Sequence, residues 1–408
     1  MTRFSALLLA GVSLLLACSG TAQAPPASSS SASSTVSASG YRVFVRASDS
    51  IHRLGSDPGA GAKLPEGVFS PDGKQLFATY GTDLRSFDPA TGALTADLRL
   101  PDYYGEIAGQ SPDGRHLALT GDFNGATRFA SVSSRLDGRV RSAMLTNNFS
   151  FDALSEDGRW VYLIEKIAGP LDYRVRRYDL DLGRLDPNIL VEKGAEPTAV
   201  MNGERYASVA VAAYSTVYSL YYGKSGAFVH ALALGGGPIQ CIDLPGPRAL
   251  DPERQVQWTL ALSPGHEALY AVNAAEGVVS RISLSSGKVS SNTFSPPAAP
   301  GSWWSPLTTA RAKYGEGGTA TVSPDGKTLF ASALHGYVAI DTATLKLRGS
   351  YLTDSRVASL AATPDGRWLL AVRDDSRLVR ITPSDGHVDG VLLSGLGPLS
   401  VLRVDPVS

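Results

Sequence analysis

The sequence is poor in cysteine, and this excludes several kinds of site. Its 408 residues contain only Cys18 and Cys241, and Cys18 falls within an apolar N-terminal segment. One cysteine is therefore left for the rest of the chain. A c-type haem needs Cys-x-x-Cys-His and a structural disulfide needs two thiols, so both are excluded. Cys241 lies in the run GGGPIQCIDLPG, where we expect a buried free thiol rather than a reactive one.

The sequence also lacks an excess of either charge. It has 37 basic and 38 acidic residues, and no long block of one sign. We therefore expect no nucleic-acid partner. The six histidines are scattered, and only His335 falls at a turn on the side of the fold where we expect binding. Because metal sites need clustered ligands, we expect no metal centre and no cofactor.

No apolar run is long enough to span a bilayer. The run from Phe4 to Ala17 follows Arg3 and has too few residues for a transmembrane helix, which needs about 20. It is typical of a signal peptide, residues 1–17. Its end, Leu15-Leu16-Ala17-Cys18, resembles the lipobox of bacterial lipoproteins, which implies cleavage before Cys18 and acylation of its thiol. The alternative is an ordinary secretory signal with a chance cysteine.

Residues 18–40 consist almost entirely of Ser, Ala, Thr, Pro and Gly after the cysteine. Such a stretch buries too little apolar surface to fold, so we interpret it as a flexible tether. The resulting expectation is an exported, membrane-anchored chain of the cell envelope, on either the periplasmic or the cell-surface side. Residues 41–408 would form one folded domain, which we expect to be monomeric.

A short phrase recurs throughout this domain and predicts its fold. The copies, aligned on the Asp of Pro-Asp-Gly, are centred on Asp72, Asp113, Asp157, Asn202, Gly265, Asp325 and Asp365. Each copy is an apolar run, a turn and a second apolar run, which predicts a β-hairpin. Two more runs and a second Gly-containing turn follow. A strand-turn-strand unit repeated about every 40–50 residues is typical of an all-β β-propeller with four-stranded blades.

The two ends of the domain predict how the ring closes. Residues 41–54 look like the second and third strands of a blade without its first strand, and residues 397–406 look like a lone first strand. The C-terminal strand would then complete the N-terminal blade and remove exposed sheet edges. Counting this composite blade gives eight blades, which we favour over seven.

The repeats resemble the YVTN-type and WD-like propeller repeats of bacterial surface and periplasmic proteins. The residues LFAS at 329–332 and LYAVN at 269–273 stand where that signature falls, although Tyr-Val-Thr-Asn itself is absent. The resemblance implies a propeller, but such propellers host binding proteins, scaffolds and enzymes alike. Trp160 and Trp368 occupy one repeat position in the second strand of their blades, where we expect core residues.

The irregular sequence concentrates at one end of the predicted blades. The turns between second and third strands (121–128, 165–174 and 373–375) and the links between blades (101–109, 235–256 and 294–316) fall there. Loops on a rigid scaffold carry function, so we place ligand binding on this face. The candidate residues are Tyr103, Tyr104, Glu106, Asp122, Asp172, Tyr173, Trp303, Trp304, Arg311, Tyr314, Asp374 and Asp375.

Two functions remain open. We favour a non-catalytic binding or scaffold propeller for a protein, peptide or glycan, with Trp303 and Trp304 as the most distinctive feature. Packing of that tryptophan pair between blades is an equal alternative. The second function is a lactonase-like or other hydrolase that uses carboxylates near the central channel as acid and base, or as calcium ligands. The candidate carboxylates are Glu106, Asp122, Asp172, Glu316, Asp374 and Asp375.

Overall fold

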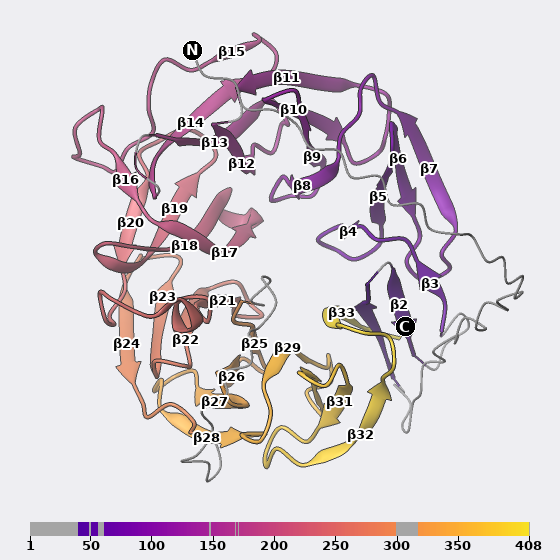
Figure 1. The fold of residues 1–408 in the computed structure, drawn as a ribbon, viewed down its shortest axis with the longest axis vertical. Coiled ribbons are helices and arrows are strands. Elements are labelled where there is room, and N and C mark those ends of the chain that lie inside the picture. Colours follow the sequence, from indigo (N-terminus) through magenta and orange to yellow (C-terminus); the bar gives the residue numbers. More distant parts are fainter. Residues whose placement is uncertain are drawn as a thin grey trace, which may run out of the picture. The chain divides into compact units, whose positions relative to one another are not determined.

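Eight antiparallel sheets follow one another around a ring in the computed structural model (Figure 1). The structure describes residues 40–48, 50–55, 61–146, 148–167, 169, 171–298 and 317–407, all within one compact unit. Each sheet is a blade, so the predicted eight-bladed β-propeller is confirmed. No helix in the described residues has the length and apolar character needed to cross a membrane.

Within each blade, strands A to D run from the channel to the rim, and blades are numbered from the one that contains β1. Blade 1 consists of β33 (Ser400–Pro406), β1 (Tyr41–Arg46), β2 (Ile51–Leu54) and β3 (Lys63–Leu64). Blade 2 consists of β4 (Val68–Phe69), β5 (Leu76–Tyr80), β6 (Asp83–Phe87) and β7 (Leu94–Arg99). Blade 3 consists of β8 (Glu106–Gln110), β9 (His116–Phe123), β10 (Ala126–Ser133) and β11 (Val140–Thr146). Blade 4 consists of β12 (Phe149–Leu154), β13 (Trp160–Lys166), β14 (Asp172–Asp179) and β15 (Arg184–Leu185), with β16 (Met201–Asn202) also paired to β14.

The other four blades complete the ring. Blade 5 consists of β17 (Glu204–Val211), β18 (Thr216–Gly223), β19 (Gly226–Ala233) and β20 (Gln240–Asp243). Blade 6 consists of β21 (Thr259–Leu262), β22 (Ala268–Asn273), β23 (Val278–Ser283) and β24 (Val289–Thr293), preceded by the short helix α1 (Pro252–Gln255). Blade 7 consists of β25 (Ala320–Val322), β26 (Thr328–Ser332), β27 (Tyr337–Asp341) and β28 (Leu347–Tyr351). Blade 8 consists of β29 (Val357–Ala362), β30 (Leu369–Arg373), β31 (Leu378–Ile381) and β32 (Val388–Leu393).

The ring closes as the sequence predicts. The last strand, β33, pairs antiparallel with the first, β1, from Tyr41 opposite Pro406 to Arg46 opposite Ser400. The first and last strands of the described chain are thereby joined in one sheet, and the inner edge of β1 is covered. Closure of this kind leaves no long unpaired strand edge at the junction.

The Pro-Asp-Gly turn is held by side-chain hydrogen bonds that repeat from blade to blade. In blade 2, the Ser70 hydroxyl donates to the Asp72 carboxylate at 2.7 Å and accepts the Gln75 N–H at 3.0 Å. Gly73 takes the left-handed conformation that this turn needs, with φ at 72°. The same hydroxyl–carboxylate bond recurs at Ser111–Asp113, Ser155–Asp157, Ser323–Asp325 and Thr363–Asp365.

The copy centred on Asn202 was aligned wrongly. Asn202 lies in β16, which pairs with the third strand of blade 4, and the strand after it, β17, is the first strand of blade 5. The A–B turn of blade 5 is instead the 3₁₀ turn Ala212–Tyr214, followed by Ser215 in the left-handed conformation. The chain between β15 and β17 is consequently a long link between blades 4 and 5, which the repeat alignment did not predict.

Two predicted loop assignments are also wrong. The turn placed at 121–128 is a tight hairpin in which only Asn124 and Gly125 separate β9 from β10, both with positive φ, as a type I′ turn requires. The segment 235–256 is not one link, because it contains β20 and α1. The link proper follows β20.

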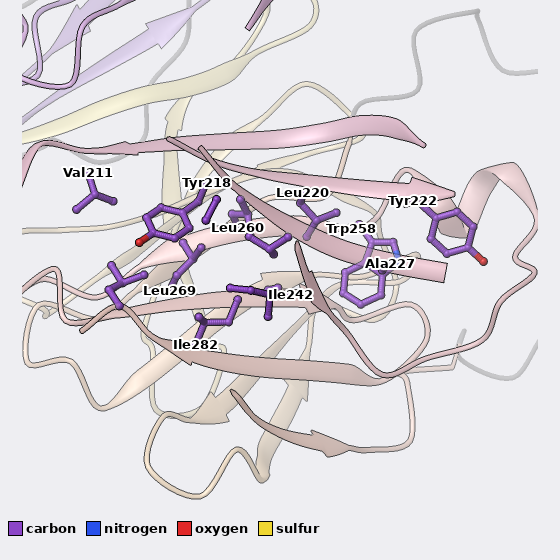
Figure 2. Close-up of a cluster of buried hydrophobic side chains, with 14 of the residues drawn as sticks. Val211, Tyr218, Leu220, Tyr222, Ala227, Ile242, Trp258, Leu260, Leu269 and Ile282 are labelled. Atoms are coloured by element: carbon purple, nitrogen blue, oxygen red, sulfur yellow. The ribbon is translucent and has the colours of Figure 1, made fainter. Parts of the chain in front are cut away.

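The hydrophobic core is a series of clusters between neighbouring blades. Figure 2 shows the cluster between blades 5 and 6, where Trp258 is 1% exposed and packs with Leu220, Leu260 and Leu269. Alternate residues of each strand face the preceding and the following blade, so every blade is buried on both sides. Trp160 and Trp368 are half-buried at the edges of such clusters, under arginine side chains, rather than in the centre of a core.

Candidate functional site

One end of the ring carries the B–C turns and the links between blades, and we call it the long-loop face. Glu106 is the first residue of β8, at this end of a strand that lines the channel. Asp122 lies near the same end of β9. Asp374 and Asp375 lie in the turn between β30 and β31, on the other side of the ring (Figure 1).

A cleft of about 780 Å³ opens on this face between blades 3 and 4 and reaches the first strand of blade 5. We call it the blade 3/4 cleft. Its charged lining residues are Glu106, Asp122, Lys166 and Arg205, and its aromatic ones are Phe129, Phe149 and Phe151. Two of the predicted site residues, Glu106 and Asp122, are therefore brought together in one hollow.

The register of blade 3 places these two carboxylates on one wall. Glu106 lies opposite Thr120 in β9, and Asp122 follows two residues later on the same face of that strand. Each carboxylate accepts a threonine hydroxyl at 3.2 Å, Glu106 from Thr120 and Asp122 from Thr127. Diagonal neighbours of this kind lie roughly 7–8 Å apart. The wall is therefore acidic and held in position by hydroxyl groups.

The opposite wall is basic. Lys166 ends β13, and Arg205 comes from the first strand of blade 5. Arg205 donates to the buried Asp152 carboxylate at 2.7 Å and to the Phe151 carbonyl at 3.2 Å. Burial raises the pKa of Asp152, and the Arg205 charge opposes that shift. Arg205 thus ties blade 5 to blade 4 where the cleft ends.

Two glycines shape the cleft. A Cβ at Gly121 would lie 3.1 Å from the Tyr103 carbonyl oxygen and the Tyr104 Cα, so the link before β8 can lie directly against β9. A Cβ at Gly109 would lie 2.7 Å from the Phe151 ring, so this ring packs over bare backbone. Sequence reasoning missed both glycines and Phe151, because a single Gly in a strand indicates close approach without saying of what.

An aromatic rim lies beside the acidic wall. The side chains of Tyr103 and Phe123 are 57% and 52% exposed, which is unusual for rings of this size. Arg128 connects them, with its guanidinium 5.2 Å from the Phe123 ring centroid and a hydrogen bond of 3.4 Å to the Tyr103 carbonyl. Tyr104, by contrast, is fully buried between blades 2 and 3.

The other described candidates lie outside this cleft. Asp172 accepts from the Asn202 amide at 2.6 Å. Tyr173 is buried and stacks on Tyr221 with 5.1 Å between ring centroids, and burial raises its pKa. Asp375 lies among arginines, 3.6 Å from Arg377. His335 is exposed in the turn after β26, where it was expected.

Several predicted residues lie outside the described part of the chain: Cys18, Trp303, Trp304, Arg311, Tyr314 and Glu316. Among the residues that the structure does describe, no three His, Cys, Asp or Glu side chains come close enough together to hold a metal ion.

Cys241 is a free, half-buried cysteine on β20. Burial raises the pKa of its thiol to about 12. Such a thiol stays protonated and unreactive at neutral pH, as the sequence suggested. Its neighbour across the strand pair is His230, whose pKa is lowered to about 4 by burial, so the ring is neutral there.

Comparison with known proteins supports the fold. No protein family model and no curated protein matches the sequence. Among solved structures, apo AztD from Citrobacter koseri matches with a TM-score of 0.53 at 12% identity, over 90% of this chain and 99% of that chain. BamB from Moraxella catarrhalis matches with a TM-score of 0.51 at 13% identity, over 81% of this chain and 88% of that one. At these identities, the likeness shows a WD-like β-propeller and nothing about the ligand.

Proposed function

We propose that this protein is a non-catalytic binding propeller of the cell envelope, and that the blade 3/4 cleft takes a peptide segment of a partner protein. The observation that carries the proposal is the cleft itself, in which Glu106 and Asp122 face the basic groups of Lys166 and Arg205. A peptide presents amide groups and both charge signs along its length. It therefore matches a cleft with acidic and basic walls better than a uniformly charged ligand does.

The exposed rings of Tyr103 and Phe123 extend this surface beyond the cleft. Aromatic and arginine side chains carry much of the energy at protein interfaces, and Arg128 contacts the Phe123 ring and the backbone carbonyl of Tyr103. The fold holds the cleft on strands rather than on loops, so little conformational entropy is lost on binding.

The experiment is a display selection of random peptides on the purified protein, followed by calorimetry of the selected peptides. The test variant is Glu106→Gln/Asp122→Asn, which keeps both threonine hydrogen bonds and removes the charge. The matched control is Asp374→Asn/Asp375→Asn on blade 8. We expect selected peptides to lose at least about tenfold in affinity with the first variant only, since hydrogen bonds to charged groups contribute about 1.5–3 kcal/mol. Equal loss in both variants, or in neither, would contradict the proposal.

A hydrolase is the second candidate, and one observation favours it. Glu106 and Asp122 lie on the same wall of the cleft, as a general acid and a general base would. Turnover of lactone or ester substrates that disappears in Glu106→Gln and persists in the blade 8 control would replace binding by catalysis. Peptide binding without any turnover would leave the binding function in place.

We also propose that the chain is exported and anchored by a lipid on Cys18. Support comes from the apolar run and the Leu15-Leu16-Ala17-Cys18 sequence at its end. Mass spectrometry of the N-terminal peptide from a bacterial membrane fraction should find cleavage before Cys18 and an acylated thiol. A Cys18→Ser variant should move to the soluble fraction. An unmodified Cys18 in the membrane fraction would refute the anchor without affecting the cleft.

A further inference from the structure

A histidine and the free cysteine lie side by side in the outer half of blade 5. His230 of β19 is directly opposite Cys241 of β20, so both side chains are on the face of the blade that packs against blade 4. Directly opposite residues in an antiparallel pair have Cβ atoms about 4.5–5.5 Å apart. A thiol sulfur and an imidazole nitrogen at these two positions can therefore reach one small ion between them.

His230 is buried without a partner for its Nε2 atom. The side chain is 1% exposed, and no described residue forms a hydrogen bond with Nε2. Its ring lies 5.7 Å from that of Tyr221, and burial lowers its pKa to about 4, so the imidazole is neutral. Buried polar atoms are nearly always paired. In the tautomer with its proton on Nδ1, Nε2 offers a lone pair, which is what a metal ion needs.

Cys241 is half-buried, so solvent reaches this side of the pair. Burial raises the pKa of its thiol, and the negative charges of Glu192 and Asp243 raise it further. Tyr173 faces the thiol from blade 4 and adds no charge, because burial raises the pKa of its hydroxyl. The two carboxylates thus favour a positive charge at the sulfur. A bound cation also removes the cost of burying the thiolate, because the pair then has less net charge.

The two donors favour one kind of ion. A structural zinc site has four ligands, whereas Cu(I) is monovalent, is satisfied by two, and prefers sulfur and imidazole. A Cu(I) thiolate with a neutral imidazole carries no net charge, so it can lie in a buried interface between blades.

We propose that Cys241 and His230 bind Cu(I) through Sγ and Nε2. On binding, the S–H bond of Cys241 breaks, an S–Cu bond forms, and the proton leaves to solvent. Copper stays in the Cu(I) state, so the step needs no oxidant or reductant.

This site goes beyond the peptide-binding function and does not depend on it. Residues of β19 and β20 do not line the blade 3/4 cleft. Failure of either proposal therefore leaves the other unaffected, and a peptide selected on the cleft should bind equally well with and without Cu(I).

The test measures Cu(I) binding by the full chain carrying Cys18→Ser, so that Cys241 is its only thiol. Cu(I) is supplied anaerobically as its complex with ferrozine, a coloured chelator whose absorbance falls as the protein takes the ion. We expect about one Cu(I) per chain, since the two donors form a single site. X-ray absorption at the copper edge should show both a sulfur and a nitrogen donor. No transfer from ferrozine, or copper bound by sulfur alone, would overturn the proposal.

Three variants locate the site. Cys241→Ser should abolish the transfer of Cu(I), because a serine hydroxyl is not a soft ligand. His230→Gln should weaken binding at least about tenfold, the loss found even when a residue behind a metal ligand is removed. His335→Gln is the matched control, because this histidine is exposed on blade 7, and it should leave the affinity unchanged. Binding that survives Cys241→Ser, or equal loss in the two histidine variants, would refute the proposal.

The pH dependence tests the same site without a substitution in it. Cu(I) displaces the proton of the Cys241 thiol, whose pKa burial raises to about 12, so the affinity should rise about tenfold per pH unit between about pH 5.5 and 8. The His230 ring is neutral throughout this range, and burial keeps Tyr173 and Tyr221 protonated. An exposed histidine would titrate near about pH 6.5 and make the slope steeper below that value. An affinity that does not change with pH, or a break in the slope near that pH, would also overturn the proposal.

Discussion

Replacing Arg205 with alanine is expected to destabilise the protein at neutral pH and much less in acid. The Arg205 guanidinium donates at 2.7 Å to Asp152, whose side chain is 2% exposed, while Arg205 itself is 35% exposed. Without its partner, the Asp152 carboxylate is a buried charge with no compensating cation. Breaking a buried pair in this way costs about 3–5 kcal/mol.

The electrostatic cost of leaving Asp152 without Arg205 has an upper limit, because the folded protein can always accept a proton on the Asp152 carboxylate. The unfolded pKa is 3.8, and each pH unit above it costs about 1.4 kcal/mol to neutralise. At pH 7 the electrostatic cost therefore cannot exceed about 4.4 kcal/mol, and at pH 4, where the unfolded carboxyl group is already partly protonated, it cannot exceed about 0.6 kcal/mol. The lost hydrogen bond to the Phe151 carbonyl adds about 1 kcal/mol at either pH.

The sign of the pH dependence is also determined. Burial raises the folded pKa of Asp152 above its unfolded value, so its contribution to stability is greatest below pH 3.8 and is lost as the pH rises through the folded pKa. Removing Arg205 raises that pKa further, so the pH range between the unfolded and the folded pKa of Asp152 becomes wider.

Urea unfolding at pH 4 and pH 7 measures the effect. We expect Arg205→Ala to lower the free energy of unfolding by about 3–5 kcal/mol at pH 7 and by about 1 kcal/mol at pH 4. The double variant Asp152→Asn/Arg205→Ala should recover most of the loss at pH 7, because no charge is left buried. An equal loss at both pH values, or no recovery in the double variant, would show that Arg205 acts through packing instead.

Three further predictions concern the scaffold. Asp179→Asn should lower the free energy of unfolding in urea by about 1–2 kcal/mol at pH 6 and by progressively less toward pH 2. Hydrogen bonds from Arg159 lower the pKa of Asp179 to about 2, and the stabilisation that they give is lost as the carboxylate is protonated. Gly336→Ala should lower the melting temperature far more than Gly326→Ala does. Both glycines have positive φ, but only at Gly336 would an added Cβ meet backbone, 2.0 Å from the Tyr351 carbonyl oxygen. Similar melting temperatures of the two variants would contradict this. Deleting β33 should abolish the cooperative unfolding transition followed by circular dichroism, because β1 and β29 would both lose their neighbour.

The fold was predictable because one turn, an Asp-Gly held by a preceding hydroxyl residue, recurs in five of the eight blades. Each Pro-Asp-Gly marks a turn between two apolar runs, and the composite first blade follows from one missing and one extra strand at the ends. The repeat alignment failed where the sequence departs from this phrase. Met201-Asn202-Gly203 resembles the repeat in residues, but β16 pairs with blade 4, and the true turn at Ala212–Tyr214 contains neither Pro nor Gly.

The candidate site was predictable only in part. Position in a loop near a strand end suffices to place Glu106 and Asp122 on the long-loop face, and the two meet because β8 and β9 pair in the right register. Lys166, Arg205 and Phe151 come from other blades, so their convergence depends on inter-blade packing that no local pattern encodes. Tyrosine is a residue type that is common at binding sites, yet the rings of Tyr104 and Tyr173 are buried. An aromatic side chain in a link between strands can point inward as readily as outward.

The hydroxyl residue before each Pro-Asp-Gly was also overlooked, and its contribution can be measured against a control within the same fold. Ser70 both donates to Asp72 and accepts the Gln75 N–H, whereas Ser263 of blade 6, whose turn has no aspartate, only accepts from the Glu267 and Ala268 N–H groups. Ser263→Ala should therefore lower the free energy of unfolding by about 1 kcal/mol. Ser70→Ala should lower it by about 2 kcal/mol at pH 7, because this substitution also removes a hydrogen bond to a charged group. The Ser70 hydroxyl lowers the pKa of Asp72, so its extra contribution is present above pH 3.8 and is lost as the pH falls through the folded pKa. The free energies of unfolding of the two variants in urea should differ at pH 7 and converge near pH 2. A difference that stays constant with pH would mean that the Ser70 hydroxyl acts by packing. No difference at pH 7 would mean that the aspartate holds the turn without the hydroxyl.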